Sequence, residues 1–238
     1  MNTFHDFPKL ECPFEKDEDY KIFPKVRDEY RWVFSKESIA VVKIDGTNVS
    51  LWVRNGRPYA IINRTNEIDI WKKGSFRFLV GVINAIERNY FKPSILADGG
   101  YFGELIGPKV QGNPYHLEDP LWVPFSYLLE KYKYKFWDTF IEDEVEGKSD
   151  EEILGSVDTL FKGLWCIYKR AKGLENKYEL GSVANVNEDS KFHTSMAAEG
   201  IVFYRKGHEN DFTKCCKLRR DNFDWYKGKE HGTRKEKE

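Results

Sequence analysis

The sequence predicts an α+β fold with antiparallel sheets flanked by helices. Most apolar segments of the 238-residue chain are short, rich in β-branched residues and separated by tight turns. Only two segments, 75–90 and 149–161, carry apolar residues at helical spacing. Short connections favour antiparallel pairing, because a parallel pair needs a long crossover. Strands that outnumber helices and follow one another through turns are typical of the α+β class, and the length fits a single domain over 1–238.

The N-terminal part begins with irregular chain and continues with strands. Residues 1–37 are polar with scattered aromatic residues and three prolines, so we predict an arm with a turn or a short helix. Three β-branched or alternating segments follow, at 38–45, 48–54 and 59–63, with a turn over 55–58. They predict an antiparallel meander with short connections.

Two helices and several further strands complete the predicted fold. Ser75 is a candidate N-cap for the first helix, and Ser149 with Glu152 forms a capping box for the second. The apolar stripe of the first helix comprises Phe76, Leu79, Val80, Ile83, Ile86 and Tyr90. Pro124 indicates that the strand containing it is an edge strand or is bulged. The further strands are predicted over 101–107, 121–128, 163–170 and 200–205 and around Lys217.

Composition limits the possible functions. The net charge of −1 does not by itself indicate a nucleic-acid binder, and the acidic run 138–152 is typical of a solvated face. The segment from Lys214 onward is basic, and we predict a disordered tail over 229–238. The four cysteines form no CxxC pair, so neither a structural zinc site nor a disulfide framework is expected. Without a signal peptide or a membrane-length apolar segment, the default location is intracellular and cytoplasmic, with no membrane partner.

Lys43-Ile44-Asp45-Gly46 is the first segment with possible chemistry. A lysine at the end of an apolar strand followed by Asp-Gly is, taken alone, a common hairpin tip. Three later segments change that interpretation. Glu104 lies inside an apolar strand, Glu199 precedes a β-branched strand, and Lys217 and Arg219 are two residues apart, so that both face one side of a sheet. Isolated charges are costly to bury, so these groups predict a shared polar pocket.

These motifs, in this order, resemble the covalent nucleotidyltransferase superfamily of DNA ligases, RNA ligases and mRNA-capping guanylyltransferases. The resemblance spans roughly residues 38–222, and it rests on four short motifs, each weak alone. Lys43-Ile44-Asp45-Gly46 resembles the first motif, Glu104 the third, Glu199 the fourth, and Lys217 with Arg219 the fifth. This resemblance implies an adenylation-domain fold with the nucleotide pocket between the sheets.

Details of the motifs favour one branch of this superfamily. Thr47-Asn48 stands where DNA ligases and capping enzymes usually carry an arginine two positions after Asp-Gly, and it resembles the ATP-dependent RNA ligases. So do the stretches from Gly103 to Tyr115 and from Lys217 to Phe223. The fifth motif departs from the frequent Lys-x-Lys pattern, because an arginine occupies its second basic position. We predict no separate C-terminal OB domain, which leaves the way RNA is held undefined.

The resemblance implies a role for each catalytic residue. Lys43 would attack the α-phosphate of ATP, giving Lys–AMP and pyrophosphate. A lysine with a reference pKa of ~10.4 is almost wholly charged at neutral pH, so nearby cations would lower the pKa of Lys43. Glu199 would hold Mg²⁺ (or Mn²⁺), while Lys217 and Arg219 would neutralise the α-phosphate.

The other motif residues are assigned to the nucleotide. Glu104 would accept hydrogen bonds from ribose hydroxyls, and the turn residues Asp45, Gly46 and Asn48 would reach substrate oxygens. Two further residues match the superfamily by their spacing in sequence from Lys43 and Glu104. Arg64 would contact the nucleotide or an RNA 5′-phosphate, and Phe125 would stack on the purine. A surface cation and a core ring are equally good interpretations of these two.

The predicted activity is RNA ligation by a monomer. AMP would pass from Lys43 to an RNA 5′-phosphate, and an RNA 3′-hydroxyl would then displace it, which is the chemistry of RNA repair. The first alternative is a GTP-dependent capping-type guanylyltransferase, which Thr47-Asn48 disfavours. The second is a catalytically inactive RNA-binding relative, which the intact Lys43 and Glu199 disfavour.

Overall fold

The computed structural model describes Phe4 and residues 7–92, 97–113, 115, 117–169 and 199–226. These residues gather into two compact units. We call the part built on 4–8 and 45–131 the first unit, and the part built on 9–44 and 132–226 the second unit. Each is an α+β assembly of antiparallel strands and helices, so the predicted class is confirmed. The predicted tail over 229–238 lies outside the described residues.

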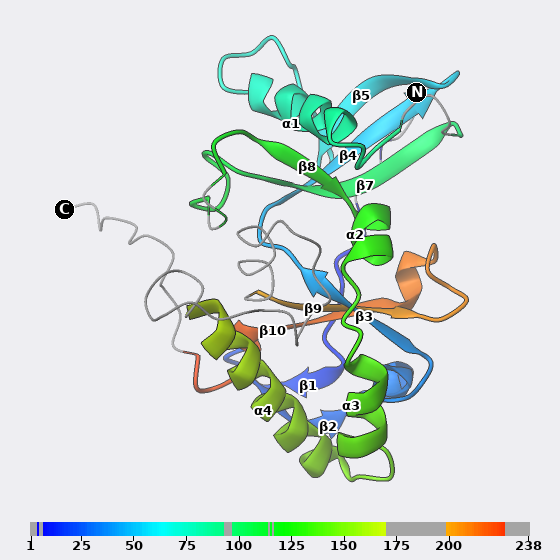
Figure 1. The fold of residues 1–238 in the computed structure, drawn as a ribbon, viewed down its shortest axis with the longest axis vertical. Coiled ribbons are helices and arrows are strands. Elements are labelled where there is room, and N and C mark those ends of the chain that lie inside the picture. Colours follow the sequence, from blue (N-terminus) through cyan, green and yellow to red (C-terminus); the bar gives the residue numbers. More distant parts are fainter. Residues whose placement is uncertain are drawn as a thin grey trace, which may run out of the picture. The chain divides into compact units, whose positions relative to one another are not determined.

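The first unit is a five-stranded antiparallel sheet with one helix across a face (Figure 1). Its strands lie in the order β6-β5-β4-β7-β8. Helix α1 (Phe76–Glu87) packs over β7 and β8, and α2 (Phe125–Lys131) follows β8 directly. The strand bounds are β4 Thr47–Arg54, β5 Arg57–Asn63, β6 Asn66–Glu67, β7 Gly99–Ile106 and β8 Leu121–Pro124.

Helix α1 buries a different face from the one that the sequence predicts. Its buried residues are Phe78, Gly81, Val82 and Ala85, whereas Phe76 is 55% exposed and Ile83 41% exposed. The reason is close packing on the sheet. A Cβ on Gly81 would lie 2.3 Å from Leu105 Cδ1, so the helix approaches β7 through its smallest side chains. The predicted stripe followed the large residues and is wrong.

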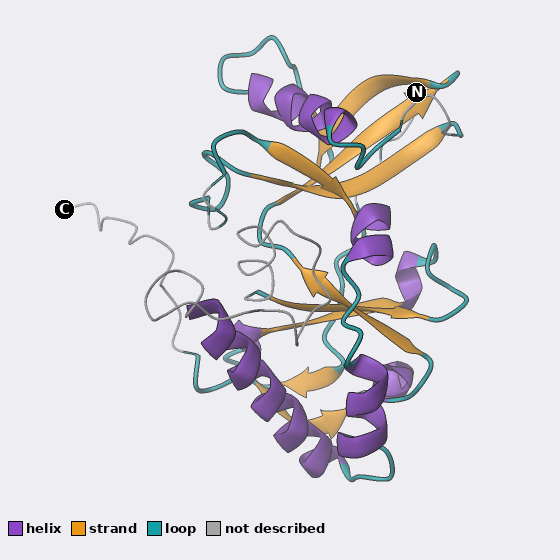
Figure 2. Ribbon diagram, in the orientation of Figure 1, coloured by secondary structure: helices purple, strands orange, loops and turns teal. Residues whose placement is uncertain are grey.

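The second unit contains a three-stranded antiparallel sheet, a β-hairpin and two main helices (Figure 2). The sheet order is β10-β9-β3, and α4 packs against β2 of the hairpin. Trp137 Nε1 donates a 2.7 Å hydrogen bond to the buried Ser38 Oγ, which ties α3 to β3. The bounds are β1 Phe14–Lys16, β2 Ile22–Val26, β3 Ser38–Lys43, β9 Gly200–Arg205, β10 Cys215–Arg219, α3 Trp137–Glu144 and α4 Asp150–Lys169, with 3₁₀ helices at η1 Asp28–Phe34, η5 Phe212–Lys214 and η6 Arg220–Asn222.

Several predicted elements differ from the observed ones. The predicted meander is confirmed in part. Strands β4 and β5 pair antiparallel as expected, but β3 pairs with β9 in a different sheet. A strand was predicted over 163–170, but residues 163–169 are instead the end of α4, whose buried residues continue at helical spacing from Ile153 to Leu164, and residue 170 lies outside the described residues. The strand predicted over 121–128 ends at Pro124, and α2 begins at the next residue, Phe125.

The predictions for the helix N-termini, for Pro124 and for the N-terminal segment can be compared with the structure. The capping box is confirmed: Glu152 Oε2 accepts the Ser149 N–H at 2.8 Å, and Ser149 Oγ accepts the Glu152 N–H at 3.4 Å. Ser75, by contrast, makes no side-chain cap hydrogen bond. Pro124 does lie on the edge strand β8. The short helix predicted before residue 38 is η1, and a β1–β2 hairpin precedes it where irregular chain was expected.

The described cysteines are buried and unpaired with one another. Cys12, Cys215 and Cys216 are free thiols. Burial raises the pKa of each of them, to about 12 for Cys215. They therefore act as core residues rather than as nucleophiles. In the part of the chain that the structure describes, no helix combines the length and apolar character needed to cross a bilayer.

Candidate active site

The register of the three-stranded sheet places Lys43 and Arg219 in one row. Lys43 on β3 and Arg219 on β10 are both paired with Gly200 on the central strand β9. Residues directly opposite one another in a sheet point to the same face, so both cationic side chains leave the same face. Lys217 pairs with Val202 two residues along, on that same face. The sequence prediction that Lys217 and Arg219 share a face is consistent with this register.

Gly200 permits this arrangement through its small size. A Cβ built on it would lie 2.2 Å from the Leu218 carbonyl oxygen and 2.9 Å from Arg219 Cα. Strands β9 and β10 therefore approach too closely for any side chain here. No side chain stands between the strand positions of Lys43 and Arg219 in this row.

Glu199 forms an ion pair with Lys43. Lys43 Nζ lies 2.7 Å from Glu199 Oε1, and the two side chains are only 18% and 13% exposed. Lys43 Nζ also donates to the Ile44 carbonyl at 3.3 Å. Glu199 is the residue just before β9, and its own carbonyl accepts the Arg220 N–H at 3.0 Å, which anchors it to the turn after β10. The structure thus brings these two predicted site residues into direct contact.

The pKa of Lys217, which lies on this face, is lowered. Burial is the main cause, and the positive charges of Lys43 and Arg219 add to it, so that the pKa of Lys217 falls to about 8. Glu199 opposes the shift and Lys16 on β1 reinforces it. The lowered pKa expected at Lys43 stays a prediction. The carboxylate of Glu199 beside Lys43 is a charge that opposes such a shift.

Arg219 is held at the edge of the group by the turn that follows it. Its Nη2 lies 2.7 Å from Asp221 Oδ2, and its backbone N–H donates to Asn222 Oδ1 at 3.0 Å. The Arg219 side chain is 39% exposed. Its guanidinium is therefore oriented on one side by Asp221 and accessible to solvent on the other.

The first unit carries a second set of the predicted residues. Asn48 on β4 and Glu104 on β7 are directly opposite, and both lie on the sheet face away from α1, because the neighbouring Leu105 faces the helix. Asn48 Oδ1 is buried and has no hydrogen-bond partner among the described residues. A buried acceptor without a donor is costly, so this oxygen is a position where a ligand donor would be stabilising.

Gly46 is packed against β7 at the edge of this set. A Cβ on Gly46 would lie 2.3 Å from the Leu105 carbonyl oxygen and 2.7 Å from Glu104 Cγ. The preceding residue, Asp45, donates its backbone N–H to the hydroxyl of the buried Tyr115. The turn over 44–46 is therefore shaped by the hydrogen bond of Asp45 and by the close packing of Gly46.

Substitution of Gly46 by alanine is expected to destabilise the chain by roughly 1–3 kcal/mol, because the added methyl group overpacks the backbone of β7. Gly155→Ala is the matched control. That glycine lies in α4, and apart from the helix's own nearby backbone no atom of the described residues lies within 4 Å of the place that an alanine methyl group would take, so alanine should be neutral or stabilising by up to about 1 kcal/mol. Urea unfolding of both variants measures the difference, and equal stabilities would contradict the close packing at Gly46.

Arg64 and Phe125 lie at other places on the first unit. Arg64 is exposed in the turn between β5 and β6, with a φ of 58°. Its neighbour Asn63 accepts a 3.4 Å hydrogen bond from Thr47 Oγ1, so Arg64 is at the same end of the sheet as Gly46. Phe125 begins α2 half-buried, and its ring packs edge-on against Phe7 with centroids 4.6 Å apart. Their assignment to nucleotide contacts stays a prediction.

A divalent metal would have one carboxylate ligand here. Among the described residues, no three His, Cys, Asp or Glu side chains gather in a way that would hold a metal ion. Mg²⁺ commonly uses one or two carboxylates and completes its shell with substrate phosphates and waters. Glu199, half-buried beside three cationic side chains, fits that mode and does not fit an all-protein metal site.

Comparison with known proteins yields structural likenesses only. No protein-family model matches the chain, and no curated protein sequence matches it. Solved structures of Naegleria gruberi RNA ligase are similar over most of the chain. A variant with AMP and Mn is 13% identical, with 92% of this chain and 60% of that chain covered and a TM-score of 0.41. A variant with ATP and Mn is 13% identical, with 91% of this chain and 58% of that chain covered and a TM-score of 0.43. The ligase with PPi is 10% identical, with 89% of this chain and 61% of that chain covered and a TM-score of 0.39. The chain thus spans about three fifths of the length of these structures.

The sequence predictions did not point to three residues that interact with the predicted site residues of the two units. Lys16 contributes to the lowered pKa of Lys217, and nothing in the irregular-looking segment around it indicated a role. Asp221 orients Arg219, and Tyr115 accepts the Asp45 N–H. Both lie inside the stretches 103–115 and 217–223, and their polar character within those stretches is the signal that points to them.

Proposed function

We propose that the chain is an ATP-dependent RNA ligase of the covalent nucleotidyltransferase type, with Lys43 as the nucleophile. The observation that supports this most is the group on one face of the second unit. There, a half-buried lysine is paired with a carboxylate, and two further cationic side chains lie within electrostatic reach. A nucleophilic lysine, a group to take its proton and a positive environment for phosphate are the parts that phosphoryl transfer to nitrogen needs.

The first step forms a bond between Lys43 Nζ and the α-phosphorus of ATP. The bond from that phosphorus to the bridging oxygen breaks, and pyrophosphate leaves with the electron pair. The amine must lose its protons to attack and to become a neutral phosphoramidate nitrogen. Glu199 Oε1, 2.7 Å from Nζ, is placed to accept the first of them.

Lys217 and Arg219 stabilise the negative charge that develops on the α-phosphate. They lie on the sheet face that Lys43 also leaves, and a preorganised cation in a half-buried site is worth more than one in water. A bound Mg²⁺ would add charge neutralisation of the phosphates, with Glu199 as its protein ligand. Lys217 must be charged for this role, which the pKa of about 8 allows at neutral pH.

The residues of the first unit are proposed to hold the nucleoside. Asn48 Oδ1 offers a buried acceptor, Glu104 directly opposite offers a carboxylate, and ribose hydroxyls can donate to both. Asp45 and Gly46 belong to the turn that precedes Asn48. We retain Phe125 as the base-stacking ring and Arg64 as a phosphate contact.

Ligation then follows in two balanced steps. An RNA 5′-phosphate oxygen attacks the phosphorus of Lys43–AMP, the N–P bond breaks, and the lysine amine is restored with a proton. An RNA 3′-hydroxyl next attacks the 5′-phosphorus of the adenylylated RNA, and AMP leaves. The product is a phosphodiester bond.

Incubation of the protein with α-labelled ATP or GTP and Mg²⁺, followed by a denaturing gel and peptide mapping, tests the proposal. The expected result is a covalent label from ATP on Lys43, and sealing of a 5′-phosphorylated RNA. A label from GTP alone would indicate the capping reaction. No label from either nucleotide, or a label on another residue, would exclude the proposed nucleophile.

The pH dependence of the first step should depend on Lys217. Its ammonium form is lost as the pH rises through its pKa, so kcat/KM for self-adenylylation should fall above about pH 8. The Lys217→Arg variant keeps its charge at every accessible pH, so its alkaline fall should be absent. Initial rates of labelling between pH 6 and about 10 measure this. A fall at the same pH in both proteins would assign it to another group.

A further inference from the structure

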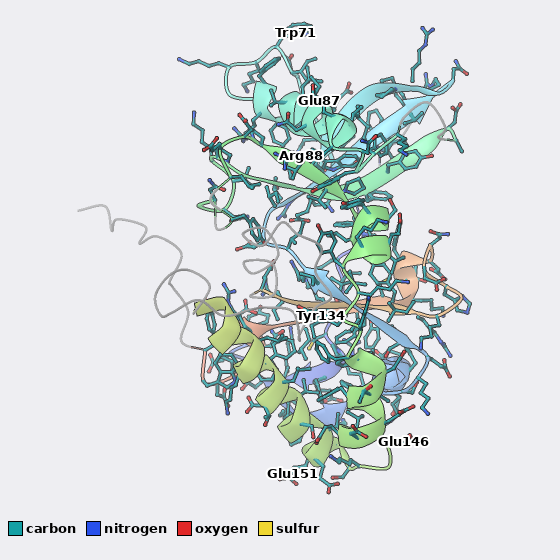
Figure 3. All side chains as sticks on the ribbon, viewed as in Figure 1. Trp71, Glu87, Arg88, Tyr134, Glu146 and Glu151 are labelled. Carbon is teal, nitrogen blue, oxygen red and sulfur yellow. The ribbon has the colours of Figure 1, made fainter. Side chains whose placement is uncertain are left out.

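The loop before α1 presents a large aromatic ring to solvent. Trp71 is 86% exposed, and Phe76, at the start of α1, is 55% exposed. Figure 3 shows Trp71 at the outer end of this loop, pointing away from the sheet of its unit. Tryptophan is highly buried on average in folded proteins, so a ring with this exposure is unusual.

The loop is held in this conformation by its own hydrogen bonds. Asp69 Oδ1 accepts the Trp71 N–H at 3.0 Å, and the Asp69 carbonyl accepts the Lys72 N–H at 3.1 Å. The Lys72 carbonyl accepts the Ser75 N–H at 2.9 Å, and Arg77 Nη1 donates to the Gly74 carbonyl at 2.6 Å. Trp71 is therefore presented by a braced turn, which lowers the ordering cost of binding a partner.

Cationic residues follow the ring in sequence, whereas Asp69 precedes it and accepts the Trp71 N–H. The segment 71–77 contains Lys72, Lys73 and Arg77 and no acidic residue, and both lysines are exposed. The chain as a whole has a net charge of −1, so this is a local feature. Cations interleaved with exposed aromatic rings are the recurrent composition of single-strand nucleic-acid sites, where bases stack and phosphates pair with lysine.

We infer that the segment 71–77 binds single-stranded RNA, with a base stacked on Trp71, phosphates paired with Lys72 and Lys73, and Phe76 as a second ring. This rests on the proposed function and deepens it, since it assigns a holding surface to the RNA substrate. A protein partner fits less well. Lysine is depleted in protein–protein interfaces, whereas two exposed lysines directly follow this tryptophan.

The test is the affinity of the full chain for a fluorescein-labelled, 5′-phosphorylated RNA of about 12 nucleotides, measured by anisotropy without ATP. This length falls within the range of single-strand site sizes. Trp71→Ala should raise Kd by roughly 5- to 100-fold, the loss of one stacked base. Trp71→Phe keeps a ring and should restore most of the affinity. The Lys72→Ala, Lys73→Ala double variant should weaken binding and reduce the slope of log K against log salt by about 1.4.

Matched controls lie on the second unit. Tyr20→Ala removes another exposed ring, 74% exposed, and should leave Kd unchanged. The Lys25→Ala, Lys36→Ala double variant makes the same change in net charge at lysines whose side chains are 60% and 61% exposed. It should leave the salt slope unchanged.

Several outcomes overturn the inference. These are no measurable RNA binding by the unaltered chain, the same Kd for Trp71→Ala, or a fall in affinity with Tyr20→Ala of equal size. A Trp71→Ala variant that binds RNA normally but changes from dimer to monomer in light scattering would assign the surface to a second copy of the chain. Because the assay contains no ATP, it remains informative if the chain does not label itself, so the failure of the inference and the failure of the proposed function are distinguishable.

Discussion

Replacing Lys43 with arginine is expected to abolish covalent labelling by ATP, with a loss of roughly 10³-fold or more. Arginine can keep an ion pair with Glu199, which now lies 2.7 Å from the lysine nitrogen. Its guanidinium is not deprotonated in proteins and cannot act as the nucleophile. The variant therefore separates the chemistry of Lys43 from its contribution to the charge balance of the site.

The measurement is the initial rate of label transfer from α-labelled ATP, together with the unfolding midpoint in urea. Lys36→Arg is the matched control, because Lys36 lies in the same unit and forms an exposed ion pair with Glu142 at 2.8 Å. It should label at the rate of the unaltered protein. A Lys43→Arg variant that labels at that rate would eliminate Lys43 as the nucleophile.

Glu199→Gln is expected to reduce the rate of labelling by roughly 10²- to 10⁴-fold, the usual range for loss of a general acid or base. Glutamine keeps the shape of the side chain but removes the negative charge beside Lys43. The same negative charge also acts on Lys217, whose pKa is lowered. Three cationic groups then lack that countercharge in a half-buried place. The free energy of unfolding should therefore fall as well, by about 1–3 kcal/mol.

Glu37→Gln supplies the comparison for this second variant. Glu37 accepts two hydrogen bonds from Arg205, but its side chain is 57% exposed, so its loss should change stability by less than about 1 kcal/mol and leave labelling intact. Stopped reactions with α-labelled ATP and urea unfolding give both quantities. If Glu199→Gln labels at an undiminished rate, the ion pair with Lys43 has no role in the reaction.

Local patterns predicted the elements well where a single segment contained the information. The strand at 48–54, the capping box at Ser149 and the edge position of Pro124 follow from alternation, side-chain chemistry and proline's missing donor. The partner of β3 could not be found in that way. Its pairing with β9 joins residues about 160 positions apart, and the tight connection from Lys43 to Thr47 looked like a hairpin.

Side-chain packing accounts for another difference between the sequence prediction and the structure. The buried face of α1 is centred on Gly81 and Ala85, which a search for large apolar residues passes over. For the candidate site, motif order grouped Lys43, Glu199, Lys217 and Arg219, and the structure places them in one sheet region. The lowered pKa of Lys217 depends on distances and burial that a sequence does not contain.

The crowding around Gly46 bears on how relatives of this chain can be interpreted. The methyl group of an alanine there would meet the Leu105 carbonyl oxygen at 2.3 Å, whatever the protein catalyses. A relative with the same packing but without the proposed activity would lose stability if this glycine were replaced, whereas its packing would place no such constraint on the lysine. A glycine at this position in a relative therefore indicates the same close packing, and the proposed chemistry has to be judged from the residues at the positions of Lys43 and Glu199.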